Sequence, residues 1–232
     1  KTGLIQPLIR SVLDSGGFAV VFDMGDGYKS LCENMGGVYL DGETLRFNPF
    51  ANITDIDQSA ERVRDQLSVM ASPNGNLDEV HEGLLLQAVR ASWLAKKNRA
   101  RIDDVVDFLK NARDNDQYVE SPTIRSRLDE MIVLLDQYTA NGTYGQYFNS
   151  DEPSLRDDAK MVVLELGGLE DRPSLLVAVM FSLIIYIENR MYRTPRNLKK
   201  LNVIDEGWDS VLDALGESDK LESERNILKD KL

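Results

Sequence analysis

The chain has 232 residues, enough for one large domain or for a domain with a substantial insertion, and enough to bury a hydrophobic core. Hydrophobic residues make up 42% and charged residues 28%, which excludes collagen-like chains, short disulfide scaffolds and tails without a core. The 39 acidic and 27 basic residues give a net charge of -12, so the surface as a whole repels phosphate backbones and no strong nucleic-acid footprint is expected.

Two chemically informative residue types occur once each. A single cysteine, Cys32, excludes an intrachain disulfide and favours a reducing compartment. A single histidine, His81, argues against a zinc site. Because His81 stands on the apolar face of a helical pattern, we expect a core or boundary residue there and not a ligand.

The first 22 residues predict a helix followed by a buried strand. Apolar residues have helical spacing over residues 3–15, and Gly16-Gly17 is a good C-terminal stop because glycine adopts the left-handed conformation at low cost. The continuous apolar run 18–22 suits a strand that is buried on both faces. The helical pattern begins directly after Lys1-Thr2 with no preceding Met or signal peptide, so we interpret the chain as an interior piece of a longer protein.

A β-hairpin is predicted next. Residues 38–40 and 44–47 have strand character and flank Asp41-Gly42, a strong two-residue turn signal. Asn48-Pro49 then ends the second strand of this predicted hairpin.

Residues 57–139 are predicted to be entirely helical, because apolar residues recur there at intervals of three and four. Boundaries at 72–75 and at Ser121-Pro122, where Ser would cap and Pro would occupy the first turn, divide the stretch into four expected helices. The basic run 96–101 is interpreted as a solvated helix end that neutralises the helix dipole.

Strand and helix alternate again in the last third of the chain. Residues 161–166 have a buried-strand pattern, 173–193 form a long apolar helix, and 201–204 form another short buried strand. The apolar run within that helix, 175–187, is shorter than the about 20 residues needed to cross a bilayer, so a core helix is expected. This order favours a parallel sheet and an α/β fold.

Two adjacent carboxylates, Asp205 and Glu206, follow the last predicted strand directly. In P-loop nucleotidases, the first acid of such a pair holds magnesium and the second orients and polarises the attacking water. The alternative is that the two residues cap the next segment.

A second fragment points to the same chemistry. Lys1-Thr2 stands before a helix that leads into a buried strand, the context that closes a phosphate-binding loop of the form Gly-x-x-x-x-Gly-Lys-Ser/Thr. Lys1 would contact the β- and γ-phosphates of ATP and the Thr2 hydroxyl would coordinate Mg²⁺. The glycines that should precede Lys1 are absent, so we expect the chain as given to bind ATP poorly.

Two further acids at predicted strand ends have two readings each. Asp23 ends the first buried strand, where ligands gather in open α/β sheets, so it is a candidate nucleotide-binding residue; the alternative is a turn-forming Asp before glycine. Glu165 interrupts an apolar strand, and either faces the site or pairs with a neighbouring cation in a structural role.

These fragments together resemble the nucleotide-binding domain of the conjugative type IV secretion ATPases of the VirB-four family, in particular its F-type members. The match covers about residues 1–208 and is carried by Lys1-Thr2, the segment 22–33 with Gly36-Gly37, Phe47-Asn48-Pro49-Phe50, and Val203-Ile204-Asp205-Glu206-Gly207-Trp208. The resemblance implies a RecA-like P-loop NTPase fold with a parallel core sheet and an inserted all-α subdomain. It also implies ATP and Mg²⁺ as cofactors.

The same resemblance implies an organisation and a role. Residues 1–56 would begin the nucleotide-binding domain, 57–140 would form the helical insertion, 141–208 would complete the sheet up to the Asp-Glu pair, and 209–232 is an unrecognised polar tail. Family members are cytoplasmic, inner-membrane-associated motors that act as hexamers with components of the secretion channel. They use ATP hydrolysis for pilus assembly and for the export of DNA and protein.

Two other functions remain open from the sequence. A related hexameric DNA-pumping translocase would share both nucleotide motifs. Alternatively, because the loop before Lys1 is missing, the chain is catalytically inactive and its helical block docks onto a secretion-channel partner.

Overall fold

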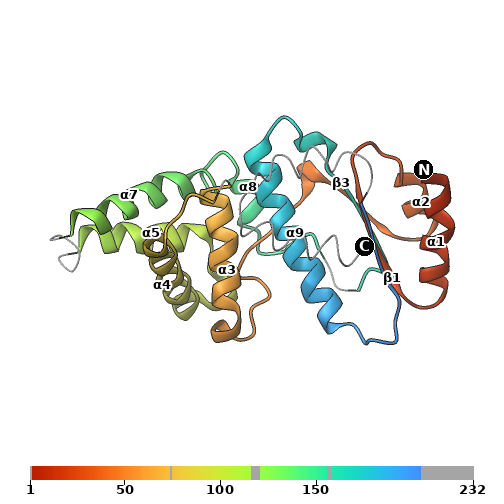
Figure 1. Cartoon of the computed structure of the whole chain (residues 1–232), viewed down its shortest axis with the longest axis horizontal. Helices are drawn as coiled ribbons and strands as arrows, with labels where there is room; N and C mark the ends of the chain where they lie inside the picture. The colour runs from red at the N-terminus through yellow and green to blue at the C-terminus, as the bar shows by residue number, and fades with distance from the viewer. Residues whose placement is uncertain (1, 74, 116–120, 156–157, 205–232) are drawn as a thin grey trace. The chain divides into compact units, whose positions relative to one another are not determined.

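The computed structural model describes residues 2–73, 75–115, 121–155 and 158–204 (Figure 1). The chain divides into two compact units. The sheet unit comprises residues 1–45 and 154–232, and the helical unit comprises residues 46–153. Each unit is described by itself below.

In its described residues, the sheet unit has four parallel strands in the order β2-β3-β1-β4. This arrangement confirms the parallel sheet that the sequence predicts. In Figure 1 the sheet lies between α9 on one side and α1 and α2 on the other. The elements, in chain order, are α1 (Thr2–Asp14), β1 (Phe18–Asp23), α2 (Lys29–Asn34), β2 (Val38–Asp41), the 3₁₀ turn η1 (Gly42–Thr44), β3 (Met161–Glu165), the 3₁₀ turn η3 (Gly167–Leu169), α9 (Pro173–Arg193) and β4 (Lys200–Ile204).

A two-glycine turn reverses the chain between α1 and β1. Gly16 adopts a left-handed φ of 81°, as its predicted role as a helix stop requires. A Cβ on Gly17 would lie 2.3 Å from the carbonyl oxygen of Lys199, so only glycine fits this close approach. Thirteen helical residues and six strand residues both extend about 20 Å. The first turn of α1 therefore lies level with the carboxyl end of β1.

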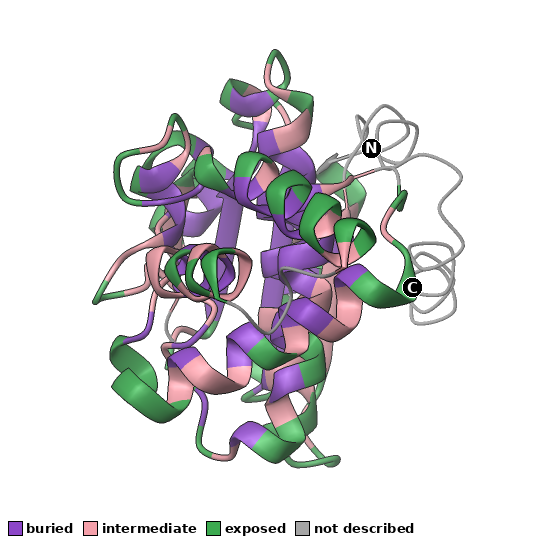
Figure 2. Ribbon diagram, turned by 90° about the vertical axis from the view of Figure 1, so that its left-hand side faces the viewer, coloured by how far each residue is buried: buried purple, intermediate pink, exposed green. Residues whose placement is uncertain are grey.

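The two central strands are buried along their whole length, whereas the outer two are partly exposed (Figure 2). This confirms the expectation for 18–22 and 161–166. It corrects the expectation of a fully buried last strand: β4 is an edge strand of the described sheet, and of its residues Val203 alone is buried. One face of the sheet packs on α1 and α2 in a cluster that comprises Ile9, Leu13, Ala19, Val21, Tyr28, Leu31, Cys32, Met161, Val163 and Val203.

The long apolar helix α9 has the bounds that the sequence predicts, Pro173–Arg193. Among the helices that the structure describes, α9 is the one that is long and apolar enough to cross a membrane by length and composition. Two thirds (67%) of its most apolar window is nevertheless buried inside the protein, as in the core helix of a globular domain.

The predicted hairpin at 38–47 is wrong. β2 ends at Asp41, whose side chain accepts a hydrogen bond from the Glu43 backbone N–H (2.8 Å) and so begins the 3₁₀ turn η1. β2 pairs with β3 in parallel and not with a following strand. Phe47 finds other backbone partners, because its N–H donates to Tyr147 and its carbonyl accepts from Ser150. Long-range pairing therefore outcompeted a strong local turn signal.

The described residues of the helical unit form four long helices between residues 56 and 136, as the sequence predicts for this stretch. Pro122 occupies the first turn of the fourth, as expected, but the Ser121 side chain makes no capping hydrogen bond to the described residues. The elements are α3 (Ile56–Ala71), α4 (Glu79–Lys96), the 3₁₀ turn η2 (Lys97–Arg99), α5 (Ile102–Asp114), α7 (Pro122–Asp136) and the short α8 (Gly145–Phe148).

The lone histidine is part of a helix cap, which confirms its predicted place in the core or at its boundary. Asp78 accepts hydrogen bonds from the backbone N–H groups of Val80 and His81, both at 3.1 Å, at the N-terminus of α4. The buried His81 ring contacts Asp78 through Nδ1 (2.7 Å) and Glu130 through Nε2 (3.2 Å). These contacts join the start of α4 to α7.

Candidate functional site

Acidic residues occupy the ends of three neighbouring strands. Asp41, Glu165 and Asp23 are register partners across β2, β3 and β1. On the other side of β1, Ile204 pairs with Phe22, and Asp205 is the next residue in the sequence. The carboxyl edge of a parallel sheet is where open α/β folds bind ligands, so this edge is the candidate functional site.

Asp23 is 2% exposed, and both of its carboxylate oxygens are occupied by the loop that follows β1. Oδ1 accepts a hydrogen bond from the Met24 N–H (3.1 Å), and Oδ2 accepts one from the Tyr28 N–H (2.9 Å). This geometry fits the turn-forming alternative for Asp23. Its proposed contact with nucleotide would have to coexist with these two hydrogen bonds.

Glu165 is 8% exposed and holds the same loop from the neighbouring strand. Its Oε2 accepts hydrogen bonds from the N–H groups of Gly25 (3.0 Å) and Asp26 (2.9 Å), and its Oε1 accepts one from Gly167 (2.8 Å). Backbone N–H donors satisfy a buried carboxylate that has no cationic side chain among its described hydrogen-bond partners. Glu165 therefore has a structural role, but its described partners are backbone N–H groups and not the neighbouring cation expected from the sequence.

Tyr39 of β2 contacts loop 24–28, the loop that follows β1. The Tyr39 hydroxyl donates a hydrogen bond to Asp26, which has a left-handed φ of 58°. Burial, the hydrogen bond to Asp26 and the nearby carboxylates of Glu165 and Asp23 raise the pKa of the Tyr39 hydroxyl far above its ordinary value. Lys29 lies 5.1 Å from the centre of the Tyr39 ring. Loop 24–28 is therefore fixed by Asp23, Glu165 and Tyr39 together.

The four residues predicted to handle phosphate, metal and water lie at the margins of the described chain. Lys1, Asp205 and Glu206 are outside the described residues, and of Thr2 the structure gives the backbone at the start of α1. The described part still fits a phosphate ligand, because the first-turn N–H groups of a helix have no intrahelical partners and α1 begins level with the carboxyl edge. Within the described ranges, no three His, Cys, Asp or Glu residues are arranged to hold a metal ion.

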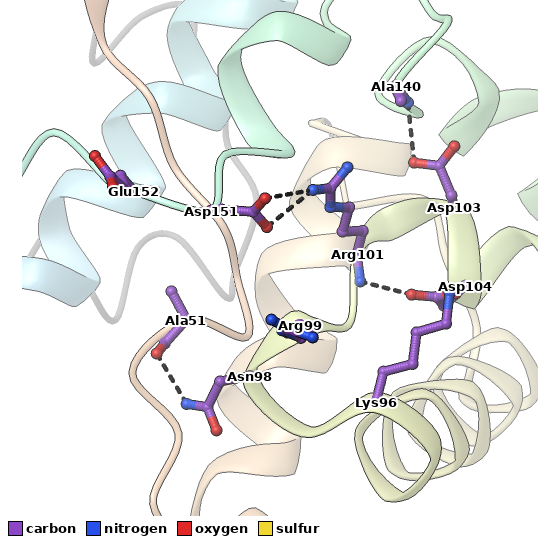
Figure 3. A pocket seen from close by; sticks show the side chains of 10 residues that line it. All are labelled: Ala51, Lys96, Asn98, Arg99, Arg101, Asp103, Asp104, Ala140, Asp151 and Glu152. Carbon is purple, nitrogen blue, oxygen red and sulfur yellow. Dashed lines mark hydrogen bonds and ion pairs between the residues drawn. The ribbon is translucent and has the colours of Figure 1, made fainter.

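A cavity of about 810 Å³ lies wholly within the helical unit (Figure 3). Four of its charged side chains form two ion pairs. Arg101 donates to both carboxylate oxygens of Asp151 (2.8 and 2.9 Å), and Lys96 lies 2.6 Å from Asp104. Figure 3 shows Arg101 pointing at Asp151 across the cavity.

Residues 96–99 of the basic run are exposed, as the sequence predicts, but most of its cations have partners within the helical unit. Two of its cations are in the ion pairs just described, and Lys97 lies over the Trp93 ring, 3.9 Å from its centre. The Asn98 amide donates to the carbonyls of Ala51 and Ile53. These interactions stabilise the helical unit and do not make this run a free basic surface for nucleic acid.

The family model for the TraG P-loop domain matches residues 1–217 of the chain. The chain belongs to the TraG P-loop family. The matched range includes Asp23 and Glu165 at the strand ends. It also includes Lys1, Thr2, Asp205 and Glu206. The family assignment agrees with the P-loop NTPase fold expected from the sequence.

A curated relative is nearly identical over most of the chain. Protein TraC of Escherichia coli (strain K12) is 98% identical over 208 residues, which is 90% of this chain and 24% of TraC. The resemblance to the F-type members of the secretion ATPases is thereby confirmed. The chain spans about a quarter of the length of this relative.

Two solved structures share the fold. VirB4 of Thermoanaerobacter pseudethanolicus matches with a TM-score of 0.64 at 17% identity, over 91% of this chain and 84% of VirB4. The bacterial conjugative coupling protein TrwB matches with a TM-score of 0.55 at 16% identity, over 92% of this chain and 56% of TrwB. At these identities, the matches support the fold and leave the chemistry to the residues of this chain.

The sequence did not predict the hydrogen bonds by which Glu165 and Tyr39 hold loop 24–28 at the carboxyl edge of the sheet. It left the role of Glu165 open and gave Tyr39 no role apart from its place in the predicted hairpin. The available signal was that Glu165 ends an apolar strand just as Asp23 does. The parallel register, which brings these two strand ends side by side, is not visible in the sequence.

Proposed function

We propose that this chain is the nucleotide-binding part of an ATP-hydrolysing motor of a conjugative type IV secretion system. The observation that carries the proposal is the 98% identity with TraC over 208 residues, together with the P-loop family match. The motor would power pilus assembly and the transfer of DNA and protein. It would act as a hexamer at the cytoplasmic face of the inner membrane, in contact with channel components.

Each candidate residue has one role in this proposal. Lys1 contacts the β- and γ-phosphates, and the Thr2 hydroxyl and Asp205 hold Mg²⁺. Glu206 orients the attacking water and accepts its proton. Bound ATP and Mg²⁺ supply the phosphoanhydride bond and the positive charge that neutralises the leaving phosphate. Asp23 assists nucleotide binding by holding loop 24–28 in position, through its hydrogen bonds to the N–H groups of Met24 and Tyr28.

The sheet is compatible with this division of labour. In the described strands Ile204 pairs with Phe22, and Asp205 and Asp23 are the residues that come next in the sequence after each. The carboxylates of Asp23 and Glu165 already accept backbone N–H donors and are not needed for the metal. They keep the neighbouring loop in one conformation, which lowers the ordering cost of binding.

The decisive experiment uses the full-length relative that carries this segment. Changing the residue equivalent to Glu206 to Gln should abolish ATP turnover while nucleotide binding persists, because the water loses its base and the phosphate contacts remain. The matched control is Gln at the position of Glu170, an exposed acid on the turn after η3. Unchanged turnover in the Glu206→Gln variant would contradict the assignment.

The same protein separates the motor from its two alternatives. A DNA-pumping translocase should show DNA-stimulated hydrolysis that falls steeply with added salt, whereas a secretion motor should not. An interaction module should neither bind nor hydrolyse ATP, yet residues 57–140 should capture a channel component.

A further inference from the structure

A second pocket, of about 320 Å³, lies at the opposite, amino-terminal edge of the sheet. It is formed by the Gly16-Gly17 turn, the residue before β3 and the end of α9 with the loop that follows. Three cationic residues line it, Lys160, Arg190 and Arg193, and no carboxylate does so within the described ranges. This local excess of positive charge stands out in a chain whose net charge is -12.

Arg190 is the buried element of this pocket, with 6% exposure. Its guanidinium donates to the Tyr186 hydroxyl (3.0 Å) and to the Ala159 carbonyl, and lies 4.2 Å from the centre of the Phe18 ring. All of these partners are uncharged. Arginine has five N–H donors and stays protonated, so a buried guanidinium without a described carboxylate keeps donor capacity and charge for an anion.

Cations near the end of a helix often serve only to neutralise its dipole. Here another residue already does so. Lys200 Nζ donates to the carbonyls of Met191 (2.8 Å) and Thr194 (3.0 Å), which are carbonyls left open at the end of α9. Lys160 is not on α9 at all, because it directly precedes β3. Dipole neutralisation therefore does not account for the pocket.

We propose that this pocket binds a phosphate group, with Arg190 and Lys160 as its principal ligands. The guanidinium fork matches the oxygens of an oxyanion, and several cations favour an anion that carries up to two charges over a single carboxylate. The pocket is at the amino ends of the strands, so it is a different site from the one at the carboxyl edge. The proposal does not depend on ATP hydrolysis.

The test is a titration of the ¹⁵N-labelled 232-residue chain with inorganic phosphate, at constant ionic strength set with NaCl and followed by NMR. Phosphate should shift the Arg190 Nε–H resonance and the amides of Gly16 and Gly17. Lys160→Ala should weaken this binding about tenfold or more, because it removes one charge-assisted contact. Lys199→Ala is the matched control, since Lys199 is an exposed lysine on the same edge that does not line the pocket and should leave binding unchanged.

A second arm identifies the source of the phosphate. Cosedimentation with phosphatidylglycerol vesicles, but not with phosphatidylcholine vesicles, that is lost in Lys160→Ala would assign the group to a lipid headgroup. Binding of inorganic phosphate without vesicle binding would assign it to a soluble molecule. The proposal is overturned if phosphate shifts only loop 24–28 at the other edge, if no resonance moves, or if the two lysine variants lose binding equally.

Discussion

Asp23 and Glu165 are register partners at the ends of β1 and β3, and their carboxylates together accept four of the five backbone N–H groups of loop 24–28. Two buried acids thus lie next to each other without a described cation between them, because the loop surrounds each with N–H dipoles. The consequence is a fixed loop beside the strand that leads to Asp205.

Replacing Glu165 by Ala should destabilise the chain by about 3 kcal/mol, because three backbone N–H groups would lose a charged acceptor in a buried site. Glu165→Gln should cost less, since one acceptor oxygen remains. Urea unfolding measures both, and amide hydrogen exchange should quicken first at Gly25. Glu170→Gln, at an exposed position, is the control. Equal stability of Glu165→Ala and this control would contradict the contacts described.

Asp23→Asn separates the two readings of Asp23. One amide oxygen can replace only part of the carboxylate, so we expect a lower Tm in the absence of nucleotide, by a few degrees. Differential scanning calorimetry with and without ATP and Mg²⁺ is the measurement. A variant with an unchanged Tm and weaker nucleotide binding would instead show that Asp23 acts on the ligand directly.

The elements predicted best from the sequence are those whose pattern is local. The helix at 173–193 has a continuous apolar pattern, a Pro in its first turn and basic residues at its end, and the structure has the same bounds. The central strands are apolar on both faces, which is typical of parallel sheets. Lys1-Thr2 and Asp205-Glu206 were identified through a motif, and their roles stay predictions.

What the sequence could not reveal depends on residues that are distant along the chain. The hairpin prediction failed because Val38 and its neighbours pair with β3, more than 100 residues further on. The contacts of Glu165 with loop 24–28 depend on the same register. The ion pair between Arg101 and Asp151 likewise joins residues that no sequence pattern relates.

Cys32 should be nearly inert in the folded chain. Its side chain is buried, and burial is the main reason that its pKa rises from 9.0 to about 11. At pH 8 the thiolate fraction is then about a hundredfold lower than in the unfolded chain, and iodoacetamide should react correspondingly slowly. The folded state favours the neutral thiol, so this contribution to stability is full below about pH 9 and is lost as the pH rises towards 11. A native alkylation rate equal to that in guanidinium chloride would contradict the expectation.

Gly17→Ala should be strongly destabilising, by about 3 kcal/mol or more, because the new Cβ would be 2.3 Å from the Lys199 carbonyl oxygen, on a backbone that cannot move without breaking the hydrogen bond from Phe18. Gly25→Ala is the matched control, since nothing lies within 4 Å of a Cβ there. Urea unfolding of both variants is the measurement. If the two substitutions cost the same, α1, β1 and β4 do not meet as described.

Asp78 should make the stability of the helical unit depend on acid pH. Hydrogen bonding from the His81 backbone is the main reason that the pKa of Asp78 falls from 3.8 to about 2, with further help from the His81 ring and Arg127. A depressed folded-state pKa stabilises the fold above pH 4, and this contribution disappears as the pH falls through about 2. Asp78→Ala should therefore lower the Tm at pH 5 and differ less from the unmodified chain at pH 2.5. Glu61→Gln, an exposed acid on α3, should show no such convergence.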